Sequence, residues 1–201
     1  ANYDLLLPPI LEQKKIAEVL WGIEENIKDN QILLNNHINF KLKIFRGILL
    51  NGYSKKNYQK TEIGQIPSNW ELVNFGDIIN FTNKRESPPY SQEQKYIGLE
   101  HIKSGISKCN NYSSAKNVSS TTNIFKKGQI LYGKLRPYLD KVIVSEFDGL
   151  CTTDALVFEA NEKSTNEFLM LHLRSKRFID HNVQFSFGTK MPRTSIRIIS
   201  N

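Results

Sequence analysis

Features that would mark a secreted, membrane or disulfide-bonded protein are missing from this sequence of 201 residues. Its two cysteines, Cys109 and Cys151, are too few for a disulfide framework and lack the spacing of metal ligands, which favours a reducing compartment. No apolar run is long enough to cross a bilayer, and no signal-peptide pattern opens the chain. We therefore expect a soluble, cytoplasmic protein with no membrane partner.

Recognisable catalytic patterns are also scarce. No serine or cysteine lies in the sequence context of an activated nucleophile, and the histidines lack metal-ligand spacing. The histidines are His37, His101, His172 and His181. We therefore expect no catalytic residue and no metal site in this chain.

Two short motifs nevertheless resemble catalytic ones. Residues 87–90, Ser-Pro-Pro-Tyr, resemble the tetrapeptide with which DNA amino-methyltransferases hold a flipped base, but that motif also needs a Gly-rich loop for the methyl donor, which this sequence lacks. Glu93 and Lys95, with Asp77 upstream, suggest a nuclease site. Acid-x-Lys matches arise by chance in a lysine-rich chain, and Glu93 lies in a polar run. We therefore interpret both motifs as non-catalytic.

Proline is absent between Pro9 and Pro67, and this gap contains the longest regular pattern in the chain. The stretch from Leu7 to Gly52 can form one helix of about 40 residues, roughly 60 Å long. Pro9 suits the first helical position, and Gly52 suits the left-handed C-terminal cap. Such a helix exceeds an ordinary core helix and is typical of a spacer or a coiled-coil arm.

Apolar residues recur along this helix at steps of three and four, with a polar interruption near the middle. One face therefore needs a partner helix, whereas the other face is charged. Asn30 and His37 lie along the stripe, where polar residues fix the register of paired helices at some cost in stability. The alternative is the core helix of an ordinary globular domain. The predicted helix-pairing residues are Ile16, Leu20, Ile23, Ile27, Leu34, Ile38, Leu42, Phe45 and Leu49.

The formal net charge of +7 is unevenly distributed. Residues 1–53 contain six Lys/Arg and six Asp/Glu, whereas residues 54–201 contain 21 Lys/Arg and 14 Asp/Glu, so the second part carries the whole excess. Its basic residues concentrate in 126–141 and 174–197, where they alternate with Tyr and Phe side chains. Such a surface suits a nucleic acid, because cations release counterions and aromatic rings contact bases. The alternative is a solvated basic face with no ligand.

The second part of the chain begins with the polar, lysine-rich residues 54–62, which indicate a linker. A globular unit, residues 63–195, follows. Ser164 and Glu167 form a capping box before a helix that is expected to end near Asp180. Together with the predicted strands, this indicates an α+β fold: a long spacer or coiled-coil helix followed by a mixed α/β globular domain.

Within the globular unit, apolar runs and turn residues predict the other elements. We expect an open basic loop over 81–89, an exposed Ser/Asn-rich loop over 104–123 and one helical turn over 75–79. The predicted strands are 70–73, 95–102, 129–132, 141–144 and 151–158.

The order of several short landmarks resembles the specificity subunits of Type I restriction–modification enzymes. The helix start resembles the opening of that family's spacer helix, and the later landmarks resemble its target-recognition domain. The landmarks are Leu7-Pro8-Pro9 with Glu12-Gln13 and Ile16-Ala17, Ile66-Pro67 with Trp70, Tyr96 to Leu99, Gly128 to Tyr132, and Gly188 to Pro192.

This resemblance implies a non-catalytic subunit that reads one half of a split target in double-stranded DNA. It also implies that the long helix pairs antiparallel with an equivalent helix and docks the methylation (modification) subunits, with the restriction subunit joining through the complex. No cofactor is then expected in this chain, since S-adenosylmethionine, Mg and ATP belong to the partner subunits.

A complete subunit of the family has two such repeats, and this sequence has one. The resemblance divides it into a spacer helix at 1–53, a linker at 54–62, a recognition domain at 63–195 and the start of a truncated next repeat at 196–201. The chain is either a half-subunit that dimerises or a fragment of a longer subunit, in which case the partner helix comes from a second copy or a second repeat.

The candidates for DNA contact follow from charge and loop placement within the recognition domain. Arginine is favoured for bidentate reading of guanine, whereas lysine mostly contacts phosphate. Two other functions stay open at this point: a coiled-coil scaffold protein without DNA binding, and a stand-alone nuclease or methyltransferase. The candidate residues are Lys84, Arg85, Lys134, Arg136, Tyr138, Lys141, Thr189, Lys190 and Arg193.

Overall fold

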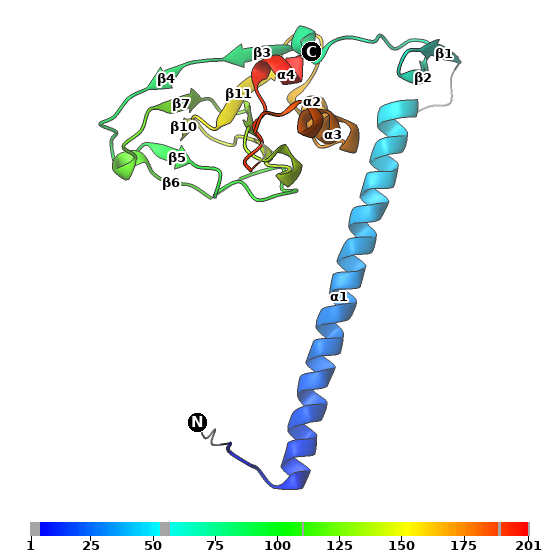
Figure 1. Ribbon diagram of the computed structural model, residues 1–201, viewed down its shortest axis with the longest axis vertical. Helices are drawn as coiled ribbons and strands as arrows, with labels where there is room; N and C mark the ends of the chain where they lie inside the picture. Colours follow the sequence, from blue (N-terminus) through cyan, green and yellow to red (C-terminus); the bar gives the residue numbers. More distant parts are fainter. Residues whose placement is uncertain (1–4, 53–56, 110, 189, 201) are drawn as a thin grey trace. The chain divides into compact units, whose positions relative to one another are not determined.

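The computed structural model describes residues 5–52, 57–109, 111–188 and 190–200. Its internal contacts divide the chain into two units, Ala1–Trp70 and Glu71–Asn201. Each unit is described by itself. The arrangement confirms the predicted fold class, a long helix followed by a mixed α/β domain (Figure 1).

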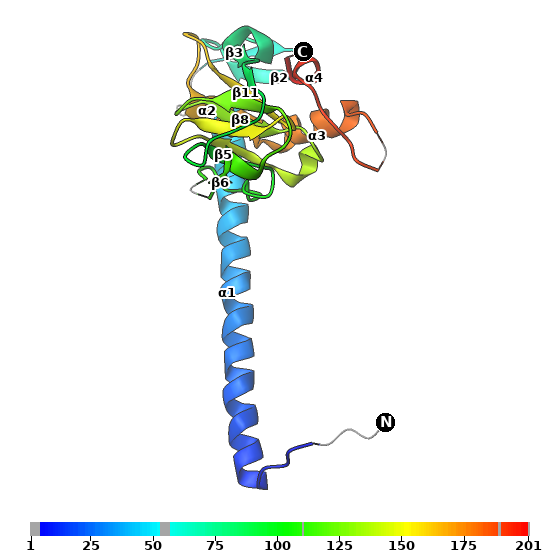
Figure 2. The same ribbon diagram turned by 90° about the vertical axis from the view of Figure 1, so that its left-hand side faces the viewer.

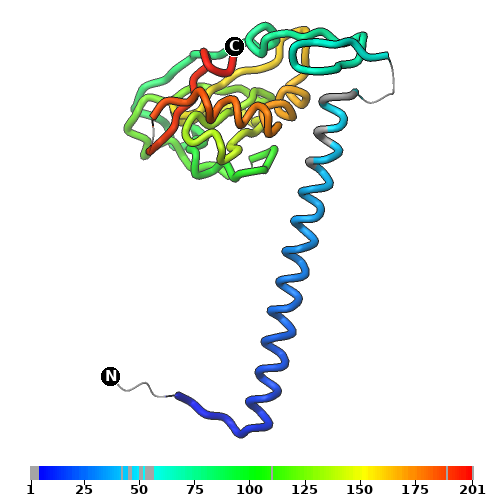
Figure 3. Tube along the Cα trace, turned by 45° about the vertical axis from the view of Figure 1, so that its right-hand side comes forward, coloured from blue at the N-terminus to red at the C-terminus, as the bar shows by residue number. Residues whose placement is uncertain are grey.

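The first unit consists mainly of helix α1, Ile10–Asn51, which runs for 42 residues without a break (Figure 3). Pro9 is its N-cap rather than its first helical residue, because the Pro9 backbone is extended (φ −56°, ψ 148°) while its carbonyl already accepts from the N–H groups of Glu12 and Gln13. At the other end Gly52 has φ 72° and donates its N–H to the Ile48 carbonyl, at 2.9 Å. A Cβ on Gly52 would lie only 3.2 Å from Pro67 and 3.3 Å from Trp70, so close packing as well as the positive φ favours glycine at this cap.

A hairpin of strands β1 (Tyr58–Thr61) and β2 (Gly64–Pro67) completes the first unit. Residues 58–61, which belong to the predicted linker 54–62, form strand β1. Strand β1 is polar because it is almost fully exposed, so it lacks the apolar pattern by which a strand is predicted from sequence. The predicted strand at 70–73 is absent; the Trp70 N–H instead closes a turn onto the Pro67 carbonyl.

The second unit contains two sheets. One has the order β3 (Ile79–Thr82), β11 (Ala155–Ala160), β8 (Ile130–Gly133), β9 (Val142–Val144), with all neighbours antiparallel. The other has the order β4 (Arg85–Glu86), β7 (Thr122–Phe125), β10 (Gly149–Thr152), β5 (Lys95–Ile97), β6 (Ser113–Ser114), with β10 and β5 parallel. In Figure 2, β11 and β8 lie side by side at the centre of this unit.

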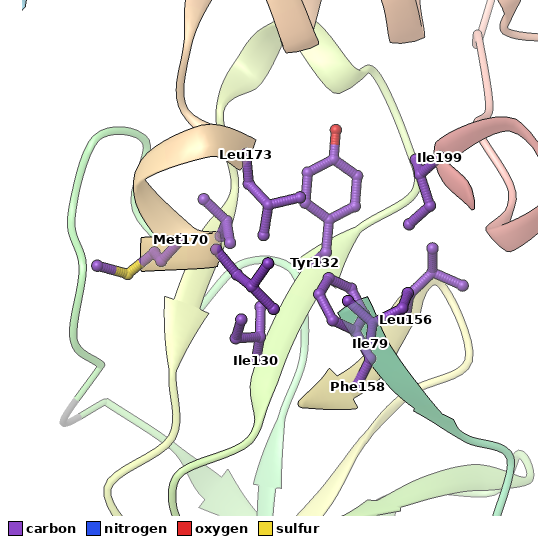
Figure 4. Packing of buried hydrophobic residues seen from close by; sticks show 10 residues of the cluster. Ile79, Ile130, Tyr132, Leu156, Phe158, Met170, Leu173 and Ile199 are labelled. Carbon is purple, nitrogen blue, oxygen red and sulfur yellow. The ribbon is translucent and has the colours of Figure 1, made fainter. Parts of the chain in front are cut away.

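Strand β8 shows how the layers pack. Ile130 and Tyr132 belong to a core formed with the C-terminal helices, whereas Leu131 belongs to the core shared with the other sheet. Side chains alternate along a strand, so both faces of β8 are covered and all four of its residues are buried. Figure 4 shows the Tyr132 ring between Leu173 and Ile199.

The helices cover one face of the four-stranded sheet. They are α2 (Asn166–Leu173), α3 (Lys176–Phe185) and α4 (Ile196–Ser200), and the short 3₁₀ turns are η1 (Phe75–Ile78), η2 (Ala115–Asn117) and η3 (Pro137–Leu139). The single helix predicted to end near Asp180 is two helices. The predicted capping box was also wrong by one residue: Thr165 accepts from the Phe168 N–H at 3.2 Å, and Ser175 caps the second helix in the same way.

Three other predicted segments differ. The strand predicted over 95–102 ends at Ile97, because the Gly98 N–H donates to Nδ1 of His101 at 2.9 Å and turns the chain. The loop predicted over 104–123 contains β6, η2 and the start of β7, with Thr122 buried. The strand predicted over 151–158 is two strands that meet at a turn.

Two further segments differ from the sequence prediction. Residues 81–89 are not an open loop, because they contain the end of β3 and strand β4. Residues 196–200, predicted to begin another repeat, form α4, whose Ile199 is buried in the helix-side core. The domain therefore uses this tail for its own packing. Among the described helices, none has the length and apolarity that crossing a bilayer requires.

Candidate nucleic-acid interface

Two segments predicted to contact DNA lie side by side although they are far apart in sequence. Arg193 pairs antiparallel with Leu135 on one side and with Phe187 on the other. The Arg136 N–H donates to the Pro192 carbonyl at 2.8 Å, and the Thr194 N–H donates to the Lys134 carbonyl at 3.0 Å. The turn after β8 and the C-terminal loop are therefore joined by isolated β-bridges and backbone hydrogen bonds, and we call these joined segments the ribbon.

Asp154, in the turn between β10 and β11, lies against this ribbon. Its carbonyl accepts from the Lys134 N–H at 2.7 Å, and its carboxylate lies 3.5 Å from Nη2 of Arg193. Burial lowers the pKa of Lys134, Asp154 acts against this shift, and the charges of Arg85 and Arg193 add to it. Two predicted DNA contacts, Arg85 and Arg193, thus lie close enough to a third, Lys134, to act on it. We call these three residues, with Asp154, the basic cluster.

The turn that carries Arg136 and Tyr138 has an unusual backbone. Arg136 (φ 49°, ψ 69°) and Asp140 (φ 47°, ψ 50°) are both in the left-handed region and flank the 3₁₀ turn η3. Each such non-glycine residue costs about 1–3 kcal/mol and persists only where surrounding structure enforces it. Pro137 is buried and anchors the turn, while Arg136 and Tyr138 are exposed. The fold thus holds a strained backbone that presents a cation and an aromatic ring to solvent.

Arg174, between α2 and α3, provides much of that support. Its guanidinium donates to the carbonyls of Gly105 (2.9 Å) and Val142 (3.0 Å) and to the Ser107 hydroxyl (3.0 Å), and it lies 3.7 Å from the Asp140 carboxylate. Burial lowers its pKa, and Asp140 acts against that shift. Its side chain is only 9% exposed, so this member of the basic segment 174–197 is structural.

The C-terminal loop is fixed in a similar way. The Thr194 hydroxyl donates to Oδ1 of Asn182 at 2.6 Å, and both residues are buried. Between these anchors the loop exposes apolar side chains: Phe187 is 71% exposed and Met191 48%. Because Phe187 and Arg193 form an antiparallel pair, their side chains leave the same face of the ribbon. A cation and an exposed ring therefore lie next to each other.

The remaining predicted DNA contacts are placed differently. Lys84 and Lys190 are exposed, and Lys84 immediately precedes Arg85. Lys141 is not brought into the cluster, because its ammonium group donates to the Leu99 carbonyl. Thr189 lies outside the described residues.

The sequence did not single out Asp154, and it marked Tyr96 only as part of a landmark, not as a site residue. Burial raises the pKa of Tyr96, nearby acidic groups that include Asp154 add to this, and a hydrogen bond with Thr152 acts against it. The only signal for Asp154 was the polar interruption Thr-Thr-Asp within the apolar run 151–158, which marks the turn between the two strands.

The Ser-Pro-Pro-Tyr motif and the cysteine thiols suit packing rather than chemistry. The hydroxyl of Tyr90 lies 2.8 Å from the Glu86 carbonyl and 2.9 Å from the Ser120 carbonyl, and its side chain is buried, so the motif is a packing feature. Burial raises the pKa of the Cys151 thiol to about 12, which leaves it protonated. Within the described part of the chain, no group of three or more His, Cys, Asp and Glu residues is placed to hold a metal ion.

On α1, the stripe of predicted helix-pairing residues is exposed. The six members from Ile16 to Ile38 are between 45% and 60% exposed, and Leu49 is half-buried. The side chains of Leu42 and Phe45 lie outside the described part of the chain. Exposed apolar stripes of this length are unfavourable in water, so this face fits a partner.

A family model described as "Type I restriction modification DNA specificity domain" matches residues 67–201, more than half of the chain. The chain belongs to this family. It is similar to the "Type I restriction enzyme EcoDI specificity subunit" of Escherichia coli, at 30% identity over 149 residues, which cover 73% of this chain and 33% of that protein. It is also similar to the "Type I restriction enzyme MjaVIII specificity subunit" of Methanocaldococcus jannaschii, at 23% identity, with 100% of this chain and 50% of that protein covered.

A solved structure supports the same fold. A chain from work on "complex assembly and conformational transition of the type I R-M system" superposes with a TM-score of 0.55 at 12% identity, covering 97% of this chain and 47% of that chain. The chain spans a third to a half of the length of the curated relatives that it matches.

Proposed function

We propose that this chain is a DNA-recognition repeat of a Type I specificity subunit. The unit Glu71–Asn201 reads one half of a split target in duplex DNA, and it carries no catalysis of its own. The observation that supports this most is the convergence of Arg85, Lys134 and Arg193 from three separate segments, beside the exposed Arg136 and Tyr138. The family membership supports the same conclusion.

Each part of the interface has a distinct chemistry. Exposed guanidinium groups, as in Arg136 and Arg193, suit the paired acceptors on the major-groove edge of guanine. The ammonium groups of Lys84 and Lys190 suit phosphates, which position a protein without reading sequence. The Tyr138 and Phe187 rings offer flat apolar contacts for bases or thymine methyl groups.

The partners follow from the helix and the family. Helix α1 pairs antiparallel with the equivalent helix of a second copy or a second repeat, which covers its apolar stripe. The methylation subunits dock on the paired helices, and the restriction subunit joins through that complex. S-adenosylmethionine, Mg and ATP are then used by those subunits, and the cytoplasm is the compartment in which such a system acts.

Fluorescence anisotropy with the full chain tests DNA recognition. A labelled duplex from a randomised library, re-selected over several rounds, should bind tightly at low salt and lose affinity steeply as salt rises. Arg136→Ala should weaken binding of the selected duplex by about 1–3 kcal/mol. Lys127→Ala is the control, because Lys127 is also exposed but lies at the opposite end of β8.

The proposal is wrong if the chain prefers no duplex over a neutral polymer at low salt. An equal loss for Lys127→Ala and Arg136→Ala would show DNA binding by charge alone and contradict recognition at this site.

A further inference from the structure

We propose that Asp154 is a specificity-determining positioning residue of the interface: it holds Arg193 in a base-reading orientation and weakens the attraction of the basic cluster for bare phosphate. This rests on the proposed DNA recognition and goes beyond it, because the residue concerned is acidic.

The first support is that Asp154 is itself held firmly. Its N–H donates to the Thr152 hydroxyl at 3.2 Å, and its carbonyl accepts from the Lys134 N–H at 2.7 Å. The strands on either side of it, β10 and β11, are inner strands of the two sheets. A carboxylate in such a turn is a fixed partner for the exposed side chain of Arg193.

The second support is the geometry of the pair. Nη2 of Arg193 lies 3.5 Å from Oδ1 of Asp154, and the Arg193 side chain is still 58% exposed. A guanidinium has five donors in a planar fork, so one edge can face a carboxylate while another stays available. The Arg193 backbone is fixed by its pairing with Leu135 and Phe187. Both ends of the side chain are therefore restrained, which reduces the entropy that base reading would cost.

The third support is the charge balance. Asp154 is near two cations, Lys134 and Arg193, and Arg85 lies close enough to the same lysine to act on it. Without it, these cations would attract the phosphate backbone of any sequence. With it, phosphate meets a local negative charge, and full affinity requires a base that offers acceptors to Arg193. Specificity is a difference of affinities, so a group that weakens the wrong complex contributes to it.

Asp154→Asn removes the charge and keeps the shape. Using the full chain, we compare the affinity for the selected duplex with that for a scrambled duplex of the same length. The substitution should raise affinity for the scrambled duplex about fivefold, as expected for one charge at ~4 Å in water. It should lower the ratio of selected to scrambled affinity about tenfold, the range of one bidentate base contact.

Asp148→Asn is the matched control. Asp148 is also paired with a cation, at 2.8 Å from Lys126, and it lies in the turn before β10, at the other end of that strand from Asp154. Asp148→Asn removes the same charge from the same unit but at a distance from the basic cluster. The affinity ratio should therefore stay within about twofold of that of the unsubstituted chain.

A second variant tests the same inference if Asp154→Asn unfolds in a thermal melt. Arg193→Lys keeps the charge but cannot form the bidentate contact, so it should lower the ratio without raising scrambled affinity. When both variants fold, the two substitutions combined in one chain should lower the ratio by less than the sum of their separate effects, because both disrupt the Asp154–Arg193 pair.

An unchanged ratio in Asp154→Asn, or in Arg193→Lys where only that variant folds, would overturn the inference. An equal fall in Asp148→Asn would overturn it too. If the unsubstituted chain binds all duplexes equally, DNA recognition itself fails, and this result differs from both of the others.

Discussion

Lys134 is the residue of the interface whose charge depends most on its surroundings. It is half-buried, so desolvation lowers its pKa, and the neighbouring arginines lower it further, whereas Asp154 partly restores it. Arginine side chains stay charged at any relevant pH, so the titration of the cluster in alkaline solution is that of Lys134. A bound phosphate would favour its charged form.

The affinity for duplex DNA should therefore fall as pH rises toward the ordinary lysine pKa of 10.5. Once Lys134 of the free protein is partly deprotonated, DNA binding requires that it take up a proton. The lowered pKa of Lys134 makes this coupling begin at a lower pH than for an ordinary lysine. Anisotropy titrations from neutral pH toward the ordinary lysine pKa of 10.5 measure the slope. Lys134→Arg should give a flatter curve, and identical slopes for the two proteins would contradict the role of Lys134.

The lowered pKa of Lys134 has the opposite effect on folding stability, which it makes rise with pH. Between the lowered pKa and 10.5, the unfolded chain binds more protons at this position than the folded chain. The contribution of Lys134 to the free energy of unfolding therefore increases with pH through that window. A loss of DNA affinity there does not reflect unfolding caused by this group, and thermal melts at each pH separate the two effects.

At the scale of single elements, the N-cap of α2 offers a direct comparison of sequence and structure. The sequence pattern predicts Ser164 as the cap, but the Thr165 hydroxyl accepts from the Phe168 N–H. Thr165→Ala should reduce the free energy of unfolding by about 1 kcal/mol, the usual contribution of such a cap. Ser164→Ala should change it by less than about 0.5 kcal/mol, because its buried hydroxyl has no hydrogen-bond partner within the described structure. Urea unfolding measures both, and the reverse order would restore the predicted cap.

The elements that the sequence predicts well are those with a strong local pattern. Helix α1 has a periodic stripe and no internal proline, and β8 and β9 are continuous apolar runs because both faces of their sheet are covered. Strands β1, β4 and β6 are short, polar and largely exposed, so no local signal marks them. Asn123 has the opposite problem: it is polar but buried, since its amide donates to the distant Ala155 carbonyl at 2.9 Å.

The interface could be predicted to a similar extent. Basic and aromatic residues in turns, such as Arg136 and Tyr138, are visible because charge and turn chemistry are local properties. The contact of Lys141 with the Leu99 carbonyl was not visible in the sequence, because the two residues are far apart along the chain. Asp154 was missed because an acidic residue in a turn is common, and its contact with Arg193 exists only after folding. Contacts between residues that are distant in sequence therefore determine what the side chains of Lys141 and Asp154 do.

At the scale of the whole chain, charge and apolar surface are divided between two parts. The helix-containing residues 1–53 are neutral, with six charges of each sign, while the rest of the chain carries the excess positive charge. The neutral helix exposes a long apolar stripe on one face. Packing of such a stripe, rather than helix propensity, normally stabilises a helix in water. This division supports the proposed roles, which are helix pairing for the first part and DNA recognition for the second.

Self-association through the stripe can be tested with two isoleucines of α1. Ile27 lies on the stripe and Ile32 lies about 140° around the helix, yet they are 54% and 50% exposed, so they are closely matched. Ile27→Lys should weaken dimerisation at least about a hundredfold, because each dimer loses two buried side chains of about 1.5–3 kcal/mol each. Ile32→Lys should change it less than about threefold. Sedimentation equilibrium of the full chain measures both; equal weakening would show that another face pairs, and a chain that stays monomeric at every concentration would show that this stripe needs a partner other than its own copy.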